Sequence, residues 1–408
     1  MDKSTLKNSF VCKLYILIYM IIMFSGSTFL SDYVMPLAVV LIGILACGAK
    51  LKGVDKIAFT SNKDRILKFI FLLIILFLIY QLTFTYDFNT TLVFLERFMI
   101  YFLYLIFIPK IIVNYKLLKS MKIYSIIVAI SILIMVIING EKSGGLVGNY
   151  QFAGMMMSIS FGLILIDYYF EKGNFNTFAL ILTFLALLSS GKRMFSFLAL
   201  LSYIIIYLFS IDSSKRKKFL GLTILVIISV IISYIFIPSV RLVVQRVAEY
   251  SNDTTYNGRS YFWDAALDIY NNHKLKGIGM GTFSKNFDVY YHRLGNMEAF
   301  DAHNIYIQML AEIGIVGELL FISFFIISLI KTLKLYKKIK EKKEKEKLYV
   351  LCYSLYLQLW FIIYGFTGNP LYGASQFFFY ITAVAMMISV KNDNLKINKK
   401  KVVQNEIM

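Results

Sequence analysis

Three motifs organise this chain: GRSYFWDAALDIY at residues 258–270, GIGMGTF at 277–283 and DAHNIYIQMLAE at 301–312. They lie in or directly beside the longest polar interval of the sequence, Ser239 to His303, which also contains every histidine. Apolar runs of membrane length flank this interval on both sides. We therefore expect a helical membrane scaffold that holds one polar segment against the bilayer, with the chemistry in that segment.

The composition is that of a polytopic membrane protein. Of the 408 residues, 58% are hydrophobic and 16% are charged, which is more apolar surface than a soluble domain of this size can bury. We predict an all-α fold with about twelve transmembrane helices, each near the ~20 residues that cross a bilayer. The predicted spans are 11–30, 33–49, 66–85, 92–113, 123–139, 153–170, 176–190, 194–211, 219–238, 305–330, 348–366 and 376–390.

Lysine and arginine are distributed unevenly among the polar segments. Of the 43, 32 fall in the segments that share a side with both termini, 10 fall in the alternate segments, and Arg97 lies inside a span. The positive-inside rule places the richer set, with both termini, in the cytoplasm. This topology explains the net charge of +19, so we expect contact with the lipid bilayer and none with nucleic acid.

Four parts follow from this topology in a chain predicted to lie in the cytoplasmic membrane. Residues 1–238 hold spans one to nine, 239–304 form an extracytoplasmic catalytic loop, 305–390 hold spans ten to twelve, and 391–408 are a basic cytoplasmic tail. The halves show no internal repeat, which weakens the case for a transporter.

The long polar interval is predicted to be helical. Ser260 is a suitable N-cap for a helix over 261–272 that turns Phe262, Ala266 and Ile269 to one face, together with Tyr270. Asp301 is predicted to cap a helix that carries His303 into the tenth span. The glycines of 277–281 predict a turn, and their spacing excludes a dinucleotide-binding motif.

Three basic residues are candidates for binding a phosphate or diphosphate. Arg259 directly precedes a predicted helix, whose free N–H groups favour an anion. Lys192 and Arg193 occupy a tight turn on the outer face of the membrane, where basic residues are disfavoured. Binding of an anionic ligand would explain their presence there. For all three, contact with lipid headgroups is the alternative interpretation.

His303 is the histidine at the junction of the polar interval and a span, where an imidazole can act as general base. A structural role is the alternative. Three dispersed histidines and three cysteines beside apolar runs predict neither a metal site nor a disulfide framework. The aromatic side chains suited to sugar stacking or to simple packing are Tyr261, Trp263, Tyr290 and Tyr291.

The three motifs, with 145–149 (GLVGN) and 190–193 (SGKR), resemble the O-antigen ligase and O-antigen polymerase superfamily. The resemblance implies a metal-independent, inverting membrane glycosyltransferase of the GT-C type without a cofactor. Its donor would be an undecaprenyl-diphosphate-linked oligosaccharide. The family's essential arginine after the seventh span corresponds to Arg193, its loop arginine to Arg259, and its loop histidine to His303. Lys192 departs from the family, which more often has a small polar residue there, and this leaves open which basic side chain lies closest to the diphosphate.

The first interpretation is a polymerase that joins lipid-linked repeat units of a cell-surface polysaccharide such as a capsule, with chain-length or flippase proteins as candidate partners. It rests on a Lys-, Ile- and Asn-rich composition typical of bacteria with low genomic GC content. A ligase that transfers the glycan to another acceptor is the alternative. A polysaccharide flippase is a third class, which would predict midplane charges and related halves.

Overall fold

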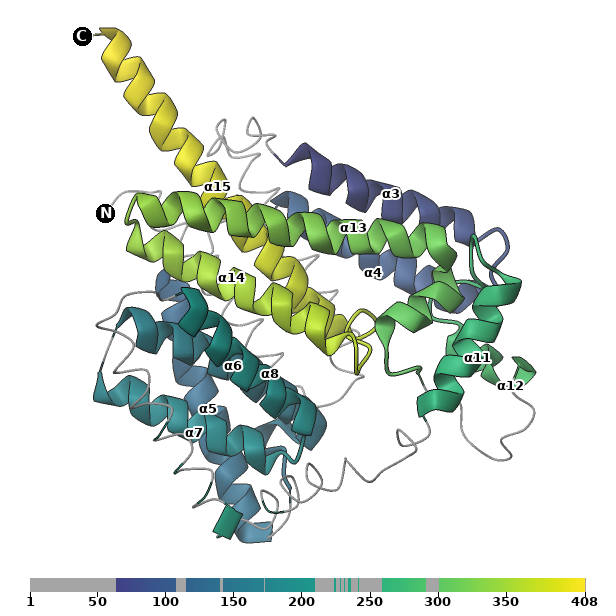
Figure 1. Cartoon of the computed structure of the whole chain (residues 1–408), viewed down its shortest axis with the longest axis horizontal. Coiled ribbons are helices and arrows are strands. Elements are labelled where there is room, and N and C mark those ends of the chain that lie inside the picture. The colour runs from purple at the N-terminus through teal and green to yellow at the C-terminus, as the bar shows by residue number, and fades with distance from the viewer. Residues whose placement is uncertain are drawn as a thin grey trace. The chain divides into compact units, whose positions relative to one another are not determined.

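The computed structural model describes residues 64–107, 115–139, 142–171, 173–209, 259–290 and 301–407, with isolated positions between 224 and 241. Within these ranges the regular structure is helical and no strand occurs. The principal helices are α3 (Arg65–Gln81), α4 (Phe88–Phe107), α5 (Tyr115–Asn139), the short η2 (Gly145–Val147), α6 (Tyr150–Phe170), α7 (Asn174–Ser189), α8 (Arg193–Phe209), α11 (Arg259–Asn272), α12 (Phe283–Tyr290), α13 (Ile305–Glu341), α14 (Lys345–Tyr364) and α15 (Ala374–Ile407) (Figure 1).

Six of the described helices are long and apolar enough to cross a membrane, which makes this a multi-pass membrane protein. They are α4, α5, α6, α13, α14 and α15. The helices α3, α7 and α8 fall on three further predicted spans but contain only 16 or 17 residues. The predicted spans 11–30 and 33–49 lie outside the described ranges, and 219–238 is described only at isolated positions, so the expected number of twelve stays a prediction.

The chain divides into two compact units. Among described residues, the first contains α5 to α8 and α14 as far as Trp360. Its centre is α6, which is buried along most of its length. Ser158 of α6 accepts from the Tyr356 hydroxyl at its carbonyl (2.6 Å) and from the Trp360 indole at its hydroxyl (3.0 Å). Because these donors lie in an apolar interior, the two bonds fix α14 on α6.

The second unit contains α3, α4, α11, α12, most of α13, and α15. An aromatic cluster holds its membrane helices together. The buried Phe98 ring of α4 lies 5.3 Å from Phe321 of α13 and 5.1 Å from Phe377 of α15. Phe71 of α3 packs edge-on against Phe324 of α13 at 5.2 Å. These are favourable aromatic geometries, so the cluster fixes how α13 is presented to the polar interval.

Ion pairs within each unit join segments that the charge distribution assigns to one side of the membrane. In the second unit, buried Asp64 accepts from Lys331 (2.8 Å) and Lys391 (2.6 Å). In the first unit, Lys122 pairs with Asp167 of α6 and with the Asn176 side chain of α7. Lys285 of α12 pairs with Asp87 before α4, and both residues lie in segments predicted for the other, extracytoplasmic side. These contacts agree with the predicted alternation of segments.

Expectations about two helices have different outcomes. The predicted helix 261–272 is confirmed as α11, with Phe262, Ala266 and Ile269 buried and Tyr270 half-buried. The predicted N-cap is wrong, because α11 already includes Arg259 and Ser260 therefore lies inside the helix. The prediction that Asp301 caps a helix containing His303 is wrong. α13 begins at Ile305, because the Asn304 side chain accepts from the N–H groups of Tyr306 (3.1 Å) and Ile307 (3.4 Å).

Candidate active site

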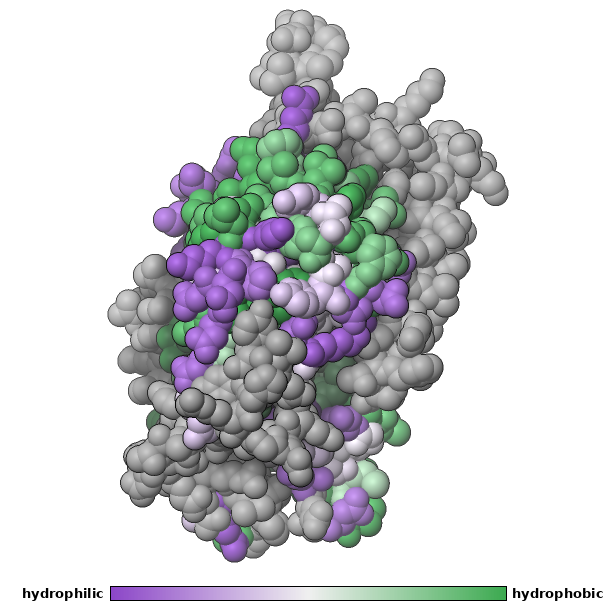
Figure 2. Space-filling view, turned by 90° about the vertical axis from the view of Figure 1, so that its right-hand side faces the viewer, coloured by the Kyte–Doolittle hydropathy of each residue, from purple (hydrophilic) through white to green (hydrophobic). Residues whose placement is uncertain are grey.

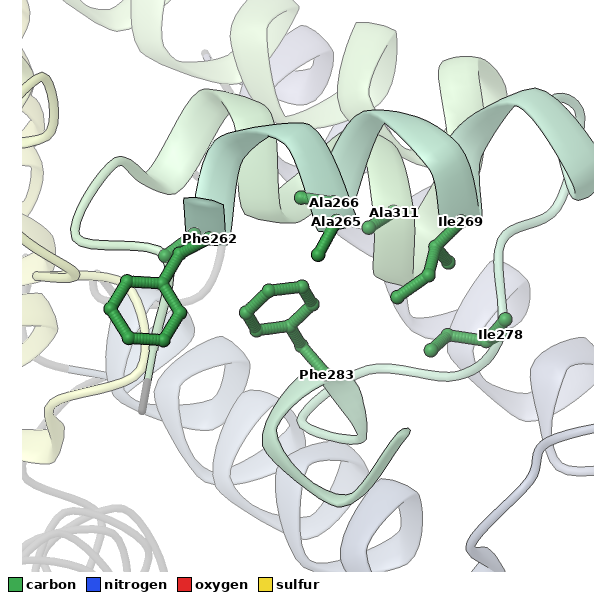
Figure 3. Packing of buried hydrophobic residues seen from close by; sticks show 8 residues of the cluster. Phe262, Ala265, Ala266, Ile269, Ile278, Phe283 and Ala311 are labelled. Carbon is green, nitrogen blue, oxygen red and sulfur yellow. The ribbon is translucent and has the colours of Figure 1, made fainter. Parts of the chain in front are cut away.

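A small hydrophobic core fixes α11 on the start of α13 (Figure 3). Phe262, Ala265, Ala266 and Ile269 point from α11 toward Ile278, Phe283 and Ala311, and Ala302 completes the cluster. The alanines allow the helices to approach closely, while the two phenylalanines fill the remaining volume. The core therefore brings all three sequence motifs into one body.

The glycine-rich turn fits a break in α13. At Gly314 the backbone has φ 60° and ψ −175°, which separates 305–313 from the long segment that follows. A Cβ on Gly314 would lie 2.5 Å from the Leu275 carbonyl carbon, and one on Gly277 (φ 68°) would lie 2.3 Å from that of Glu312. Only glycine satisfies both the conformation and the contact. The predicted turn at 277–281 is thus a docking element of the polar interval.

Glu312 is the carboxylate that holds this turn in place. It is fully buried and accepts from the backbone N–H groups of Gly281 (2.6 Å) and Phe283 (2.9 Å). Its own carbonyl accepts from Gly279 (2.9 Å) and from the side chain of Gln81 (2.9 Å). Buried polar groups need such partners, so Glu312 links α3, α13 and the turn.

Gln308, one helical turn before Glu312, connects this carboxylate to the residues around His303. Its amide NH₂ donates to Glu312 (3.1 Å) and to Asp301 (3.3 Å). Its oxygen accepts from the Ala302 N–H (3.0 Å) and from the Asn369 side chain (2.7 Å). Asp301 therefore contacts a side chain inside α13 and is not the N-cap.

His303 has a left-handed backbone, with φ 53°. This conformation is uncommon for a residue other than glycine and persists where surrounding contacts hold it. Such contacts are made by both neighbours of His303 in the chain. Ala302 is held through its N–H by Gln308 and through its carbonyl by the Trp263 indole (2.8 Å), while Asn304 caps α13. His303 lies between these two fixed neighbours.

Arg259 is the first residue of α11 and belongs to the same unit as His303. It is half-buried. The predicted cation therefore lies on the helix that packs against the turn carrying the candidate base, through Trp263 and Ala302. Tyr261 is exposed on the same helix.

Lys192 and Arg193 belong to the first unit, where Arg193 is the first residue of α8. The Lys192 ammonium lies 5.2 Å from the centre of the Tyr150 ring, and the Lys142 ammonium lies 4.4 Å from the same ring. Both distances suit cation–π contacts. Lys142 thus joins the predicted basic turn, although sequence reasoning did not select it.

The other predicted residues lie around these groups or outside the described ranges. Tyr290 ends α12, with no description of its side chain, while Tyr291 and His292 fall in 291–300. His273 follows α11, and its ring contacts Tyr86 edge-on at 5.7 Å. Burial and the Lys276 charge lower the pKa of His273. The described residues contain no cluster of three or more potential metal ligands.

The surface near α11 and α12 is mixed in character. Figure 2 looks onto the side of the molecule on which these helices lie in Figure 1, and hydrophilic patches there adjoin a hydrophobic one. Large exposed apolar side chains in this part of the chain include Leu275 and Tyr86. The Lys285 ammonium on α12 also lowers the pKa of Asp87. Such a surface is typical of the membrane–water boundary.

Sequence reasoning missed Gln308 and Glu312. Both lie in the third motif, but a glutamine and a glutamate four residues apart within an apolar run also suit an ordinary solvated pair. Their importance comes from partners more than 25 residues away at Gly281, Phe283 and Asn369. No local pattern indicates such partners.

Residues 178–322 match the family model described as O-antigen ligase. The match spans Lys192, Arg193, Arg259 and His303, as well as the docking turn and the break in α13. It confirms the resemblance to the superfamily that the motifs indicated. The comparison with curated proteins found no match.

Proposed function

We propose that this chain, whose residues 178–322 match the family model described as O-antigen ligase, polymerises a cell-surface polysaccharide from lipid-linked repeat units. The donor is an undecaprenyl-diphosphate-linked oligosaccharide at the outer face of the cytoplasmic membrane. The observation that carries the proposal is the placement of Arg259 and His303 on one packed body within the matched segment. That body adjoins α13, whose length suits a membrane span.

The donor diphosphate is bound by arginine. A guanidinium at the first turn of α11 combines two favourable features for an anion, a planar donor fork and the adjacent free N–H groups of the helix. Arg193 occupies the equivalent position on α8. In the proposed reaction Arg259 stabilises the charge that develops on the departing diphosphate oxygen. For Arg193 and its neighbour Lys192, the same role rests on the resemblance to the family alone.

His303 is the general base. An acceptor hydroxyl attacks the anomeric carbon of the donor sugar, the bond from that carbon to the diphosphate oxygen breaks, and the hydroxyl proton passes to the imidazole. Direct displacement inverts the anomeric centre. Diphosphate leaves as an anion paired with the arginines, so the reaction needs no metal and no cofactor in this proposal. Tyr261, Tyr290 and Tyr291 are the proposed contacts for the sugars. Trp263, the fourth aromatic candidate, uses its indole N–H to bind the Ala302 carbonyl.

Transfer of a completed glycan to a different acceptor is the second candidate, and the match to the family described as O-antigen ligase favours it. Both candidates use the same lipid-linked donor, and in both Arg193 and Arg259 bind the diphosphate and His303 acts as the base. They differ in the acceptor, which is the growing lipid-linked chain for a polymerase and another envelope molecule for a ligase.

Glycan profiling of a deletion strain separates the two candidates. A polymerase predicts that single repeat units still reach their final acceptor and that longer chains disappear. A ligase predicts that long lipid-linked chains accumulate and the final acceptor stays unmodified. Unchanged glycans would contradict both.

The arginine assignment has its own test. Arg259→Ala and Arg193→Ala should each abolish chain extension at normal expression, and Arg→Lys should fail at a position that uses both arms of the guanidinium. Normal product length from both alanine variants would remove the assignment. The proposed orientation is supported by the uneven distribution of lysine and arginine.

A further inference from the structure

Ala302, the residue directly before the proposed base, is bound at both of its backbone polar groups by side chains. The Gln308 oxygen accepts from its N–H at 3.0 Å, and the Trp263 indole N–H donates to its carbonyl at 2.8 Å. The two side chains come from different helices, α13 and α11. We call Trp263, Ala302 and Gln308 the Ala302 clamp.

The orientation of the Gln308 amide is determined by its neighbours. Carboxylates accept hydrogen bonds when ionised, so the NH₂ group must face Asp301 and Glu312, which lie 3.3 Å and 3.1 Å from it. The oxygen is then directed at the Ala302 N–H and the Asn369 NH₂. A glutamine supplies both a donor pair and an acceptor here, which neither a carboxylate nor an apolar residue of similar size can do.

The clamp has a consequence for His303. The left-handed backbone of this residue is strained for a side chain other than glycine and needs contacts that hold it in place. Ala302 is fixed on one side by the clamp, and Asn304 is fixed on the other as the cap of α13. The clamp also ties the turn to α11, the helix that begins with Arg259. It therefore sets the position of the base relative to the arginine.

We propose that Trp263 and Gln308 are positioning residues for the glycosyl transfer, which act by holding the His303 turn in its left-handed conformation. The inference rests on the proposed function and assigns to Trp263 a role other than sugar stacking. Neither side chain needs to touch the reacting atoms. Loss of either hydrogen bond should misplace the base while the donor-binding arginines stay in place, so kcat should fall and KM for the donor should change little.

The test uses substitutions that remove the clamp's hydrogen bonds and keep the bulk of the side chain. Trp263→Phe retains an aromatic ring and loses the single bond from the indole N–H. Gln308→Met retains length and loses all four hydrogen bonds of the amide, including the one to Ala302. The chain supplies matched controls in the first unit. Trp360→Phe removes the indole bond to Ser158 (3.0 Å), and Gln358→Met removes the bond to the Ser354 hydroxyl (3.1 Å). Both controls are buried, so they report the general effect of such losses on packing.

Transfer is measured with purified protein and lipid-linked oligosaccharide extracted from a strain that lacks this protein. The clamp predicts a loss of about 10- to 100-fold in kcat for Trp263→Phe and Gln308→Met, with KM within about twofold of wild type and with near-normal kcat in the controls. An unchanged kcat would overturn the proposal. A raised KM with normal kcat for Trp263→Phe would also overturn it, because that result identifies a sugar-binding surface. Equal losses of kcat in the clamp variants and in the controls would also overturn it, because the effect would then come from disturbed packing in general.

Hydrogen exchange of the peptide that covers 301–309 separates a failed clamp from a failed function. Faster exchange there in both variants and not in the controls is expected even if the wild-type protein transfers no glycan. Wild-type exchange in Trp263→Phe and Gln308→Met would overturn the clamp whatever the activity. Absence of transfer by the wild type would count against the proposed function and leave the exchange result to decide the clamp.

Discussion

Substituting Glu312 by glutamine should loosen the glycine-rich turn without changing the shape of the side chain. In the wild type the two carboxylate oxygens accept from Gly281 and Phe283, at 2.6 Å and 2.9 Å, inside a fully buried site. An amide has one oxygen, so one of the two N–H groups must face an NH₂ group. Leaving a buried donor without an acceptor costs about 1–3 kcal/mol.

That cost should appear as faster exchange of the turn. If the turn opens locally, a loss of about 1–3 kcal/mol raises the exchange rate of the 277–290 peptide about 5- to 150-fold, since each 1.4 kcal/mol is tenfold. The measurement is hydrogen exchange by mass spectrometry on detergent-solubilised protein. The peptide that covers α14 serves as an internal reference because it contributes no hydrogen bond to Glu312.

The matched control is Glu318→Gln in the same helix. Glu318 is also buried, and no side-chain hydrogen bond to its carboxylate is found among the described residues. Replacing a desolvated carboxylate by a neutral amide should leave the turn as stable as before. Equal exchange of 277–290 in the two glutamine variants would refute the argument, because the effect would then follow from charge alone and not from the two N–H groups that Glu312 binds.

Three further predictions concern other parts of the chain. Asp64→Asn should destabilise the second unit by about 1–3 kcal/mol in thermal unfolding, because it weakens two ion pairs whose lysine side chains are 22% and 30% exposed; an unchanged melting temperature would contradict this. His273 has a lowered pKa in the folded state, so the unfolded chain takes up its proton more readily and stability should fall as the pH drops below about 6.5; His273→Gln should flatten this part of the pH profile, and an equally steep profile would count against it. Single cysteines at Asn257 and Lys343 in a cysteine-free background should react with an impermeant thiol reagent in intact cells at 257 and not at 343, and the reverse pattern would invert the proposed topology.

Local patterns predicted much of this fold because lipid and helix geometry impose strong rules. The length of the apolar runs identified the described membrane helices. The spacing of Phe262, Ala266 and Ile269 predicted the buried face of α11, and the predicted start of this helix lies two residues after the observed one. The break at Gly314 was not predicted, because an isolated glycine in an apolar helix is usually tolerated. Its reason lies in the turn at 275–277, far away in the sequence.

The start of α13 shows why the candidate site was harder to predict. Asp301 and Asn304 are both good N-caps, and sequence alone offers no way to choose between them. The choice depends on Gln308, which binds Asp301 and Ala302 and so leaves Asn304 to cap the helix. The candidate base His303 could be predicted from the third motif. The Ala302 clamp beside it could not, because its hydrogen bonds join α11 to α13 and extend to Asn369.

The central claim is that His303 is the base of a metal-independent glycosyl transfer. The most direct test is turnover of His303→Ala with purified protein and lipid-linked donor in the presence of EDTA, with His273→Ala as the control. The account predicts a loss of about 10²–10⁴ in kcat with donor binding largely retained, and near-normal turnover in the control. Near-wild-type turnover of His303→Ala, or loss of wild-type turnover in EDTA, would contradict it.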